Sequence, residues 1–562
     1  MSDLDVLVVG AGPTGLTMAC ELARRGVSIR IIDKLDKPTE HSKALVIHAR
    51  TLELLHTMGC VEKFLELGIQ ITAVNVYDSS KKIAHLSLSH VDSPYPYSLG
   101  LPQNVTEALL HENLKEHGVD VERSCELVSI KEATDYVLAK INKSGVEEEI
   151  RCKYIVACDG AHSTVRREVK EPFEGGEYAE TFQLADVQVD WGGHGARNEL
   201  FAFSGEKGNA AFFPMPGDRF RVFTILTKEM STADLDKEPT LDEVQGRVDD
   251  VLPFKVKLSD PHWLSNFRVR YRKVKNYRHG RVFLAGDAAH CHSPVGGQGM
   301  NTGMQDAFNL AWKLALAVNG RATEALLNSY QFERNAVAEQ LLKSVDMLTR
   351  VNLLRAPIAR ELRNRLAPLL ISHEMVQSRM RNFLTELGIN YRRSPVVSEV
   401  KRSLVHAALT GDEDEPHLGD LLEFSLGPHA GDRALDSGVL DCTPIAVHLA
   451  GLFKSTKHNL LLFTGETPSS HTYSQLYDIA VAVHSEYGDY VDVNLISSEE
   501  EPTCELDFPG KRFSDPEYAS HSRYGAGVPC LYLIRPDSYV GFRSQPPELE
   551  GVDQYFKKIL KL

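Results

Sequence analysis

The stretch "LDVLVVGAGPTGLTMACELARRGVSIRIID", residues 4–33, decides the fold of this chain. It opens with a short apolar run rich in β-branched side chains, which is typical of a buried parallel strand. The next segment repeats apolar residues at helical spacing and ends at Gly26, and "VSIRIID" follows as a second strand pattern. This order of strand, helix and strand predicts a doubly wound α/β core that begins at the first residues.

Three glycines stand between the first strand and the helix. Gly10, Gly12 and Gly15 have the spacing G-x-G-x-x-G, which in this context favours dinucleotide binding, because the first permits a tight turn, the second admits a pyrophosphate and the third lets the helix pack on the strand. Pro13 suits a first helical turn, and Asp33 ends the second strand, where a carboxylate can accept bonds from a ribose. Glycines alone do not distinguish NAD from FAD, and three structural glycines in an empty turn are the alternative.

Two further turns combine a carboxylate and a glycine at the end of a predicted strand. "CDGAHSTVRR" contains Asp159 and Gly160, and "AGDAAHCHSP" contains Gly286 and Asp287. Ligands of parallel sheets bind at the carboxyl ends of the strands. Together with the glycine turn, these segments predict one long ligand that crosses the sheet.

Composition narrows the class of protein. The 562 residues include 62 basic and 77 acidic side chains, and the net charge of −15 without a basic patch argues against nucleic-acid binding. Nine cysteines without a CxxC pair indicate reduced thiols. The N-terminus has no signal-peptide pattern, and no apolar run approaches the ~20 residues that span a bilayer. We expect a soluble, cytoplasmic protein without a membrane segment.

The pattern of apolar and polar residues changes three times along the chain. Residues 1–176 carry the first α/β segment, and residues 177–279 alternate apolar and polar side chains between turns, which predicts an inserted, mostly antiparallel sheet. Residues 280–395 return to the parallel-strand style and continue as helices. Residues 396–562 start a new βα pattern and form a separate C-terminal α/β domain.

The chain resembles the FAD-dependent aromatic hydroxylases, the single-component class A flavoprotein monooxygenases, over its whole length. The segments that carry this resemblance are "VVGAGPTGL", "HARTLELL", "LPQNVTEALL", "CDGAHSTVRR", "GRVFLAGDAAHCHSPVGGQGMNTGMQDAFNLAWKLA" and "SYQFERNAVA". The later segments "HAGDRALD" and "YLIRPDSYVGFRS" are similar to the thioredoxin-like tail of the phenol hydroxylase and polyketide hydroxylase branch.

The resemblance implies a Rossmann-like FAD-binding domain, the inserted sheet as the substrate domain, and a thioredoxin-like C-terminal domain. Because this domain lacks a CxxC pair, we expect it to be structural or to help form a homodimer. The resemblance implies FAD as the cofactor, NADPH or NADH as a transient electron donor, and O2 as a substrate. A flavin C4a-hydroperoxide would hydroxylate a phenolic or polycyclic, polyketide-like aromatic compound. The alternatives are a Baeyer–Villiger oxygenase, a flavin reductase or dehydrogenase, and a non-catalytic flavoprotein.

The resemblance also assigns roles to residues. Asp33 would bind the adenosine ribose, Arg50 and Gln103 would contact FAD near its pyrophosphate and ribityl chain, and Asp287 would bond the ribityl chain. Asp159 belongs to a segment that would serve both FAD and the nicotinamide cofactor. The expected cofactor contacts are Gly10, Gly12, Pro13, Thr14, Gly15, Asp33, Lys34, Arg50, Gln103, Asp159, Gly160, Gly286, Asp287, Pro294, Gly297, Gly299, Met300 and Asn301.

The glycine-rich stretch from Pro294 to Asn301 would surround the isoalloxazine ring. Its glycines would let backbone N–H groups lie against the ring, and the helix from about Met300 would direct its positive end at the negative charge of the reduced flavin. His48 is a candidate base, although a structural histidine is at least as plausible. The expected catalytic residues are Pro294, Gly296, Gly297 and His48.

Two features leave alternatives open. His290, Cys291 and His292 form a poor metal site, since consecutive side chains diverge and no fourth ligand stands at a standard spacing. The segment "KALVIHAR" lacks the Asp that simple phenol hydroxylases often carry there, so the base lies elsewhere or the substrate is already activated. Five phenylalanines of the inserted segment either line an apolar pocket or form sheet core: Phe201, Phe203, Phe212, Phe213 and Phe220.

Overall fold

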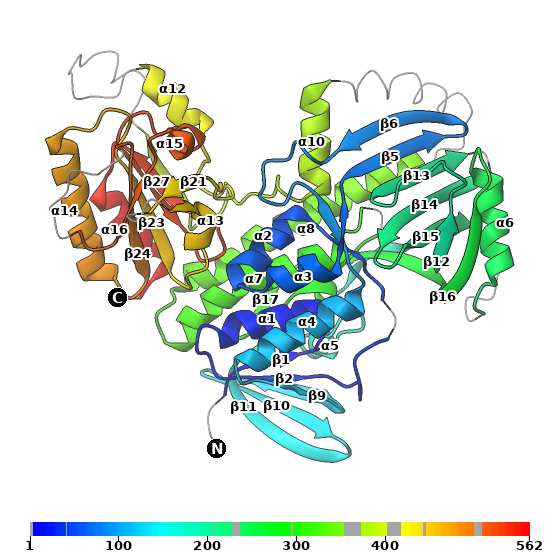
Figure 1. Cartoon of the computed structure of the whole chain (residues 1–562). Helices are drawn as coiled ribbons and strands as arrows, with labels where there is room; N and C mark the ends of the chain where they lie inside the picture. Colours follow the sequence, from blue (N-terminus) through cyan, green and yellow to red (C-terminus); the bar gives the residue numbers. More distant parts are fainter. Residues whose placement is uncertain are drawn as a thin grey trace. The chain divides into compact units, whose positions relative to one another are not determined.

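The computed structural model describes residues 4–40, 42–205, 207–226, 237–293, 296–352, 373–401, 418–441, 445–499 and 508–561 (Figure 1). The chain divides into two compact units. The first contains Met1–Leu52, Cys60–Phe308 and Arg334–Gly388, and the second contains Glu53–Gly59, Asn309–Glu333 and Ile389–Leu562. Three helices therefore continue from one unit into the other: α2 (Ala49–Met58), α7 (Gly299–Val318) and α8 (Glu324–Asn352).

The first unit is built on a parallel sheet with the order β8-β2-β1-β11-β18, which β17 extends in the antiparallel direction. Helix α1 connects β1 to β2 and packs against α4. The predicted strand, helix and strand at the N-terminus are confirmed. The elements are β1 (Leu4–Val9), α1 (Pro13–Ala23), β2 (Ile29–Ile32), α4 (Gln103–Glu116), β8 (Val121–Glu122), β9 (Cys125–Glu132), β10 (Val137–Lys143), β11 (Val146–Ala157), α5 (Thr164–Glu168), β17 (Arg278–His279) and β18 (Val282–Leu284).

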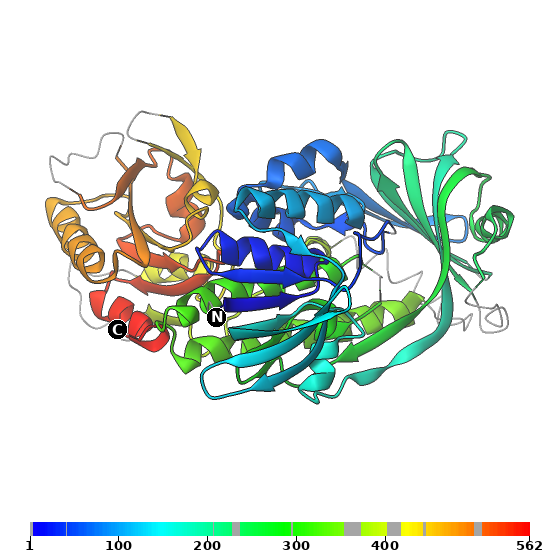
Figure 2. The ribbon, with the colours of Figure 1, turned by 90° about the horizontal axis from the view of Figure 1, so that it is seen from below.

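The inserted sheet has the order β19-β16-β12-β15-β14-β13-β5-β6, and every pairing is antiparallel except that of β13 with β5. Helix α6 packs against one side of this curved sheet, as Figure 2 shows. The strands β5 and β6 belong to it, although the sequence pattern left them in the first segment. The elements are β5 (Ala73–Asp78), β6 (Lys81–Ser87), β12 (Glu174–Asp190), β13 (Glu199–Gly205), β14 (Gly208–Met215), β15 (Arg219–Leu226), α6 (Leu241–Val251), β16 (Lys257–Lys273) and β19 (His290–Cys291).

Short elements of the first unit link these two sheets. A small antiparallel sheet has the order β3-β7-β4, and a 3-10 turn, η1, follows β18. The bounds are β3 (Val46–Ile47), α3 (Val61–Leu67), β4 (Ile69–Ile71), β7 (Ser98–Gly100), η1 (Gly286–Ala288) and α10 (Glu374–Leu384).

The second unit contains a mixed sheet with the order β20-β27-β26-β23-β24-β25-β21-β22. Helix α14 connects the parallel pair β23 and β24, and β26 lies antiparallel to β23. The elements are β20 (Ser398–Lys401), α12 (Leu418–Leu426), β21 (Gly438–Leu440), β22 (Ala446–His448), α13 (Leu449–Leu452), β23 (His458–Phe463), α14 (Ser470–Tyr487), β24 (Val491–Ser497), β25 (Lys511–Ser514), α15 (Ala519–Tyr524), β26 (Cys530–Ile534), β27 (Val540–Gln545) and α16 (Leu549–Ile559). Across the described ranges, no helix combines the length and apolar character needed to cross a bilayer.

Candidate active site

The three predicted turns meet at the carboxyl ends of neighbouring strands. The Cys158 amide donates to the Val9 carbonyl at 2.7 Å, and the Ala285 amide donates to the Ala157 carbonyl at 3.0 Å. Gly10 has a φ of +102°, and a Cβ there would collide with the Cys158 carbonyl. The first turn therefore requires glycine both for its backbone conformation and for its closeness to the second turn.

Side chains tie the third turn to the other two. A Cβ at Gly286 would lie 2.5 Å from the Thr14 hydroxyl oxygen, so the start of α1 packs directly on this turn. Arg166 donates to the Ala161 carbonyl at 2.7 Å and to the Ala288 carbonyl at 2.9 Å. Its guanidinium thereby joins the second turn to the third, and the sequence motifs form one continuous surface.

Two glycines of this surface keep their backbone accessible. A Cβ at Gly12 or at Gly160 would meet no atom within 4 Å, whereas a Cβ at Gly15 would collide with the Gly10 carbonyl. Gly12 directly precedes Pro13 at the start of α1, where the helix N-terminus favours an anion. The arrangement therefore matches a pyrophosphate cradle, with Gly15 reserved for packing between helix and turn.

Two carboxylates, those of Asp33 and Asp159, border the cradle. They differ in whether both of their oxygens accept hydrogen bonds from the protein. The Asp33 carboxylate accepts bonds from the Ala11 amide at 2.7 Å and the Leu35 amide at 2.9 Å, so it is fixed against the glycine turn. One oxygen of Asp159 accepts from the amide of Thr164 at 2.7 Å at the start of α5. The other oxygen of Asp159 is buried without a partner in the described chain, and burial raises the pKa of this group.

The Asp287 carboxylate makes no hydrogen bond or ion pair with any described residue. Its side chain is accessible, yet desolvation by the surrounding protein raises its pKa above the ordinary value. The carboxylate is available to a ligand that supplies hydrogen-bond donors.

The glycine-rich loop is pinned from its buried side. Gly296 and Gly297 have φ angles of +92° and +67°, and α7 begins at Gly299, one residue before the predicted start. The Asn301 amide group donates to the Val46 carbonyl at 2.8 Å and to the Gly297 carbonyl at 3.0 Å. Gly296, Gly297 and Gly299 stay partly accessible, while Asn301 is fully buried.

His48 also holds this loop. Its Nε2 donates to the Gly296 carbonyl at 2.9 Å, because a carbonyl oxygen only accepts, and its Nδ1 accepts from the Ser98 hydroxyl at 3.1 Å. Burial lowers the pKa of His48 to about 4. The imidazole is neutral with both nitrogens engaged, so this geometry gives it a positioning role and leaves no nitrogen for a base.

The other expected residues have varied surroundings. Arg50 is buried at the start of α2, and its amide donates to the Thr385 carbonyl at 3.2 Å. The Gln103 side chain accepts from the Ala44 amide at 3.0 Å. Lys34 is exposed and Met300 is half-buried, whereas Pro294 lies outside the described residues.

Sequence reasoning missed the turn that follows α10. The Gln298 side chain, in the glycine-rich loop, donates to the Phe383 carbonyl at 2.8 Å. The Glu386 carboxyl group accepts from the side chains of Thr302 and Gln305 on α7. This turn supports the loop from behind, and no local pattern marks it because the partners are far apart in the sequence.

The His290, Cys291 and His292 side chains do not converge on one point. His290 shares a 2.8 Å hydrogen bond with Asp306, the Cys291 thiol donates to the Asp287 carbonyl at 3.5 Å, and His292 donates to the Ser293 carbonyl at 2.9 Å. Within the ranges that the structure describes, no group of three or more His, Cys, Asp or Glu side chains could hold a metal ion.

The two faces of the inserted sheet divide its phenylalanines. The face under α6 holds Phe201, Phe203, Phe212 and Phe220 in the sheet core, together with Trp191. Phe213 lies on the other face and packs with Val46, next to the glycine-rich loop. Its ring is 5.5 Å from that of Phe223, which in turn is 6.3 Å from that of Phe267, and both partners are half-buried. Phe213 alone among the five predicted phenylalanines faces the site, with two partners that the prediction omitted.

Taken together, the fold and the site define a flavin-nucleotide-dependent oxidoreductase. A family model described as the FAD binding domain matches residues 3–345. The 6-methylpretetramide 4-monooxygenase of Streptomyces rimosus is 32% identical, over 96% of this chain and 90% of its own, and an uncharacterized aromatic compound monooxygenase of Bacillus subtilis is 37% identical over 62% of this chain and 69% of its own. The solved structure of the OxyS anhydrotetracycline hydroxylase from Streptomyces rimosus superposes with a TM-score of 0.72 at 26% identity and covers 99% of this chain and 98% of its own.

The chain belongs to the FAD binding domain family. Its cofactor is FAD, and its activity is that of a flavoprotein aromatic monooxygenase.

Proposed function

We propose that this monooxygenase hydroxylates a polycyclic, polyketide-like aromatic compound or a phenol, with NADPH or NADH as a transient electron donor. One observation carries the proposal: the accessible glycine-rich loop adjoins the aromatic face of the inserted sheet through Val46, which lies beside Gly297 and in the cluster against which Phe213 packs. Relatives named for 6-methylpretetramide and pentachlorophenol support this substrate class.

FAD would lie across the three turns. Gly12 and the N-terminus of α1 would hold the pyrophosphate, and Asp33 would hold the adenosine ribose at the end of β2. Asp287 and the unpartnered oxygen of Asp159 would accept bonds from sugar-chain or solvent hydroxyls. The bound cofactor supplies the activation of O2 and the transfer of one oxygen atom to the ring.

The chain's own residues would orient the ring and exclude water. The first turn of α7 presents backbone N–H groups beside Gly299, and its dipole favours negative charge there. His48 and Asn301 would keep the loop in the conformation that exposes these groups. Phe213, with Phe223, would give the opposite wall an apolar character that keeps water away from the reacting centre.

Among the described residues, the predicted base His48 is not available to deprotonate a substrate. His48 is neutral and engaged at both nitrogens. A polyphenolic ring is electron-rich without full deprotonation, so it depends less on a base than a simple phenol does. This difference favours the polycyclic substrates within the proposed class.

A basic cluster near the second turn would receive the electron donor. Burial lowers the pKa of His162, and the nearby cations of Arg270, Lys34, Arg166 and Lys43 lower it further. We propose that these cations attract the phosphates of a nicotinamide dinucleotide.

The second unit would be a thioredoxin-like domain without redox chemistry. The succession β23-α14-β24, followed by the antiparallel pair β26 and β27 and then by α16, supports this assignment. The sequence lacks CxxC, which thiol–disulfide exchange requires. We propose a structural role for it and a contribution to a homodimer.

The experiment is a panel of phenols and polycyclic quinols, screened for substrate-triggered NADPH and NADH oxidation under labelled O2. We expect at least one polycyclic compound to stimulate oxidation and to gain one labelled oxygen atom as a ring hydroxyl. Stimulated oxidation without incorporated label would indicate a reductase instead. Label in an inserted ester would indicate a Baeyer–Villiger oxygenase.

A further inference from the structure

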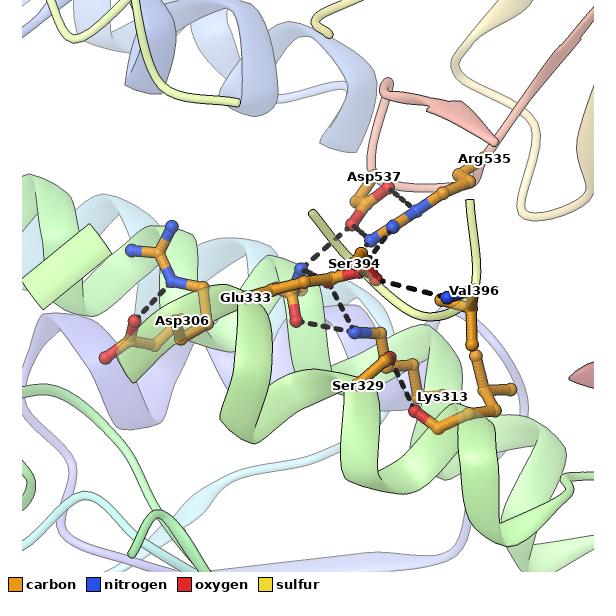
Figure 3. A network of polar contacts seen from close by, with 11 residues as sticks. Asp306, Lys313, Ser329, Glu333, Ser394, Val396, Arg535 and Asp537 are labelled. Atoms are coloured by element: carbon orange, nitrogen blue, oxygen red, sulfur yellow. Dashed lines mark hydrogen bonds and ion pairs between the residues drawn. The ribbon is translucent and has the colours of Figure 1, made fainter. Parts of the chain in front are cut away.

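A buried ionic cluster lies in the second unit where α7 and α8 pack with the turn between β26 and β27. Glu333 accepts at one oxygen from Ser394 at 2.6 Å and Arg535 at 2.7 Å, and at the other from Asn309, Lys313 and Arg535 at 2.6, 2.7 and 3.0 Å. Figure 3 shows the side chains of Lys313, Ser394 and Arg535 converging on Glu333. Arg535 is held in turn by Asp537, through a bond of 2.9 Å from its Nε.

The cluster contains equal numbers of positive and negative side chains, and all of them are buried. Lys313, Glu333, Arg535 and Asp537 are all at most 2% exposed, and two cations face two anions. Burial alone would raise the pKa of Glu333, but the Arg535 and Lys313 cations hold that pKa below its ordinary value. Apolar side chains often replace such buried ion pairs without loss of stability, so stability alone does not account for the cluster.

The next residue of α8 reaches the FAD-binding surface. Arg334 donates to Asp306 at 2.6 Å and to the Thr302 carbonyl at 3.0 Å within the first unit. Asp306 accepts from the amide of Gly286 at 2.9 Å, at the turn that carries Asp287. Because Glu333 and Arg334 are consecutive in one helix, a rotation of α8 that loosens Glu333 also moves Arg334.

We propose that Arg535 is a positioning residue for the FAD site: by fixing Glu333 it sets the orientation of α8, so that Arg334 holds Asp306 against the amide of Gly286. The C-terminal domain thereby contributes to cofactor binding without supplying a residue that touches FAD. The inference rests on the proposed role of the turn at Gly286 and Asp287 in binding FAD.

A double-mutant cycle on FAD affinity tests the inference. The variants are Arg535→Met, Arg334→Met and the double variant, and the dissociation constant is measured by quenching of flavin fluorescence with apoprotein. We expect Arg535→Met to weaken FAD binding by roughly 3- to 30-fold, the range for residues coupled through packed elements. In the Arg334→Met background the same change is expected to have no further effect, which a general loss of stability would not produce.

Arg543→Met is the matched control. Arg543 is also fully buried in the second unit, where it pairs with Glu399 at 2.8 Å and donates to the Phe424 carbonyl, but among the described residues it makes no hydrogen bond or ion pair with α7 or α8. We expect its FAD affinity to equal that of the unmodified protein. If Arg535→Met does not fold, Ser394→Ala replaces it, with a smaller loss of affinity that also vanishes in the Arg334→Met background.

Three results overturn the inference: unchanged FAD affinity in a folded Arg535→Met protein, an equal loss in Arg543→Met, or additive effects of Arg535→Met and Arg334→Met. Asp287→Ala separates this failure from that of the proposed site. If Asp287→Ala weakens FAD binding while Arg535→Met does not, only the positioning role is wrong. If Asp287→Ala also leaves FAD binding unchanged, the proposed site itself fails.

Discussion

Asp287 lies in the turn that follows β18, and Asp306, on α7, accepts a hydrogen bond from the same turn, yet the two carboxylates have opposite surroundings. Asp306 is 0% exposed and accepts from the Gly286 amide, His290 and Arg334. Asp287 is accessible and accepts from no described residue. Burial would raise the pKa of both groups, but Arg334 and His290 lower that of Asp306 below the ordinary value, while the pKa of Asp287 stays raised.

The difference shows how a structural acid is distinguished from one that serves a ligand. A buried carboxylate with every lone pair engaged holds the fold, and its partners depend on it. A desolvated carboxylate without partners costs stability, and a site that retains one gains an acceptor for a ligand. Sequence motifs do not distinguish a structural carboxylate from one that is available to a ligand. The motif "GDAAH" contains Asp287, whereas Asp306 belongs to no motif that the sequence analysis identified.

Replacement of Asp306 would have the largest effect. Asp306→Ala leaves Arg334 and His290 buried without their partner, and removing one member of a buried pair costs about 3–5 kcal/mol. We expect the free energy of unfolding of the apoprotein, measured in urea, to fall by this amount. Asp287→Ala is the control, with a change within about 0.5 kcal/mol. Equal midpoints for the two variants would remove the distinction.

Two neighbouring residues of β14 show the same contrast between a side chain that stabilises the fold and one that is available to a ligand. Phe212 is 0% exposed in the core under α6, whereas Phe213 is half-buried on the opposite face. We expect Phe212→Ala to lower the free energy of unfolding by about 3 kcal/mol, and Phe213→Ala to lower it by less while raising KM for the aromatic substrate. Urea unfolding and steady-state kinetics check both. A higher KM from Phe212→Ala in a stable protein would contradict the assignment of faces.

The FAD affinity of Asp287 variants tests whether this carboxylate serves the ligand. Asp287→Ala removes the proposed acceptor for FAD, and we expect the loss of a hydrogen bond to a charged group to weaken FAD binding by about 10- to 100-fold. Asp287→Asn keeps an acceptor oxygen and should lose less. Since the folded pKa is raised, the stability cost of the charge exists above that pKa and disappears below the ordinary value. At neutral pH the apoprotein of Asp287→Ala is therefore at least as stable as the parent, and a large loss of stability would refute the ligand role.

Local sequence patterns predicted the first strand and helix and the meeting of the three turns. The apolar run before Gly10 and the Pro13 that starts α1 are local signals, and the structure confirms both elements. The sequence also predicted that the three turns would meet, because parallel strands end at one edge of the sheet. The start of α7 differs by one residue from the prediction.

Pairings between distant segments were not predictable. Strand β5 joins the inserted sheet by pairing with β13, across a long separation in sequence, and no pattern in Ala73–Asp78 names that partner. Alternation along β14 separates Phe212 from Phe213 but does not say which face α6 covers. Likewise, the contacts of Glu386 and Glu333 depend on tertiary packing. Neither the composition of the chain nor the periodicity of its apolar residues determines that packing.

The smallest expected effect compares two glycines of the loop. Gly297 has a φ of +67°, and a Cβ there would lie 3.2 Å from the Cβ of Val46, whereas a Cβ at Gly299 would be 3.6 Å from the His292 ring, an ordinary contact. The left-handed conformation costs an alanine about 1–2 kcal/mol, so Gly297→Ala should shift the loop and weaken FAD binding by roughly tenfold. Gly299→Ala, the matched control at the start of α7, should bind FAD almost as the parent does. Equal FAD affinity of the two variants would show that the loop binds FAD without the backbone conformation that His48 and Asn301 hold.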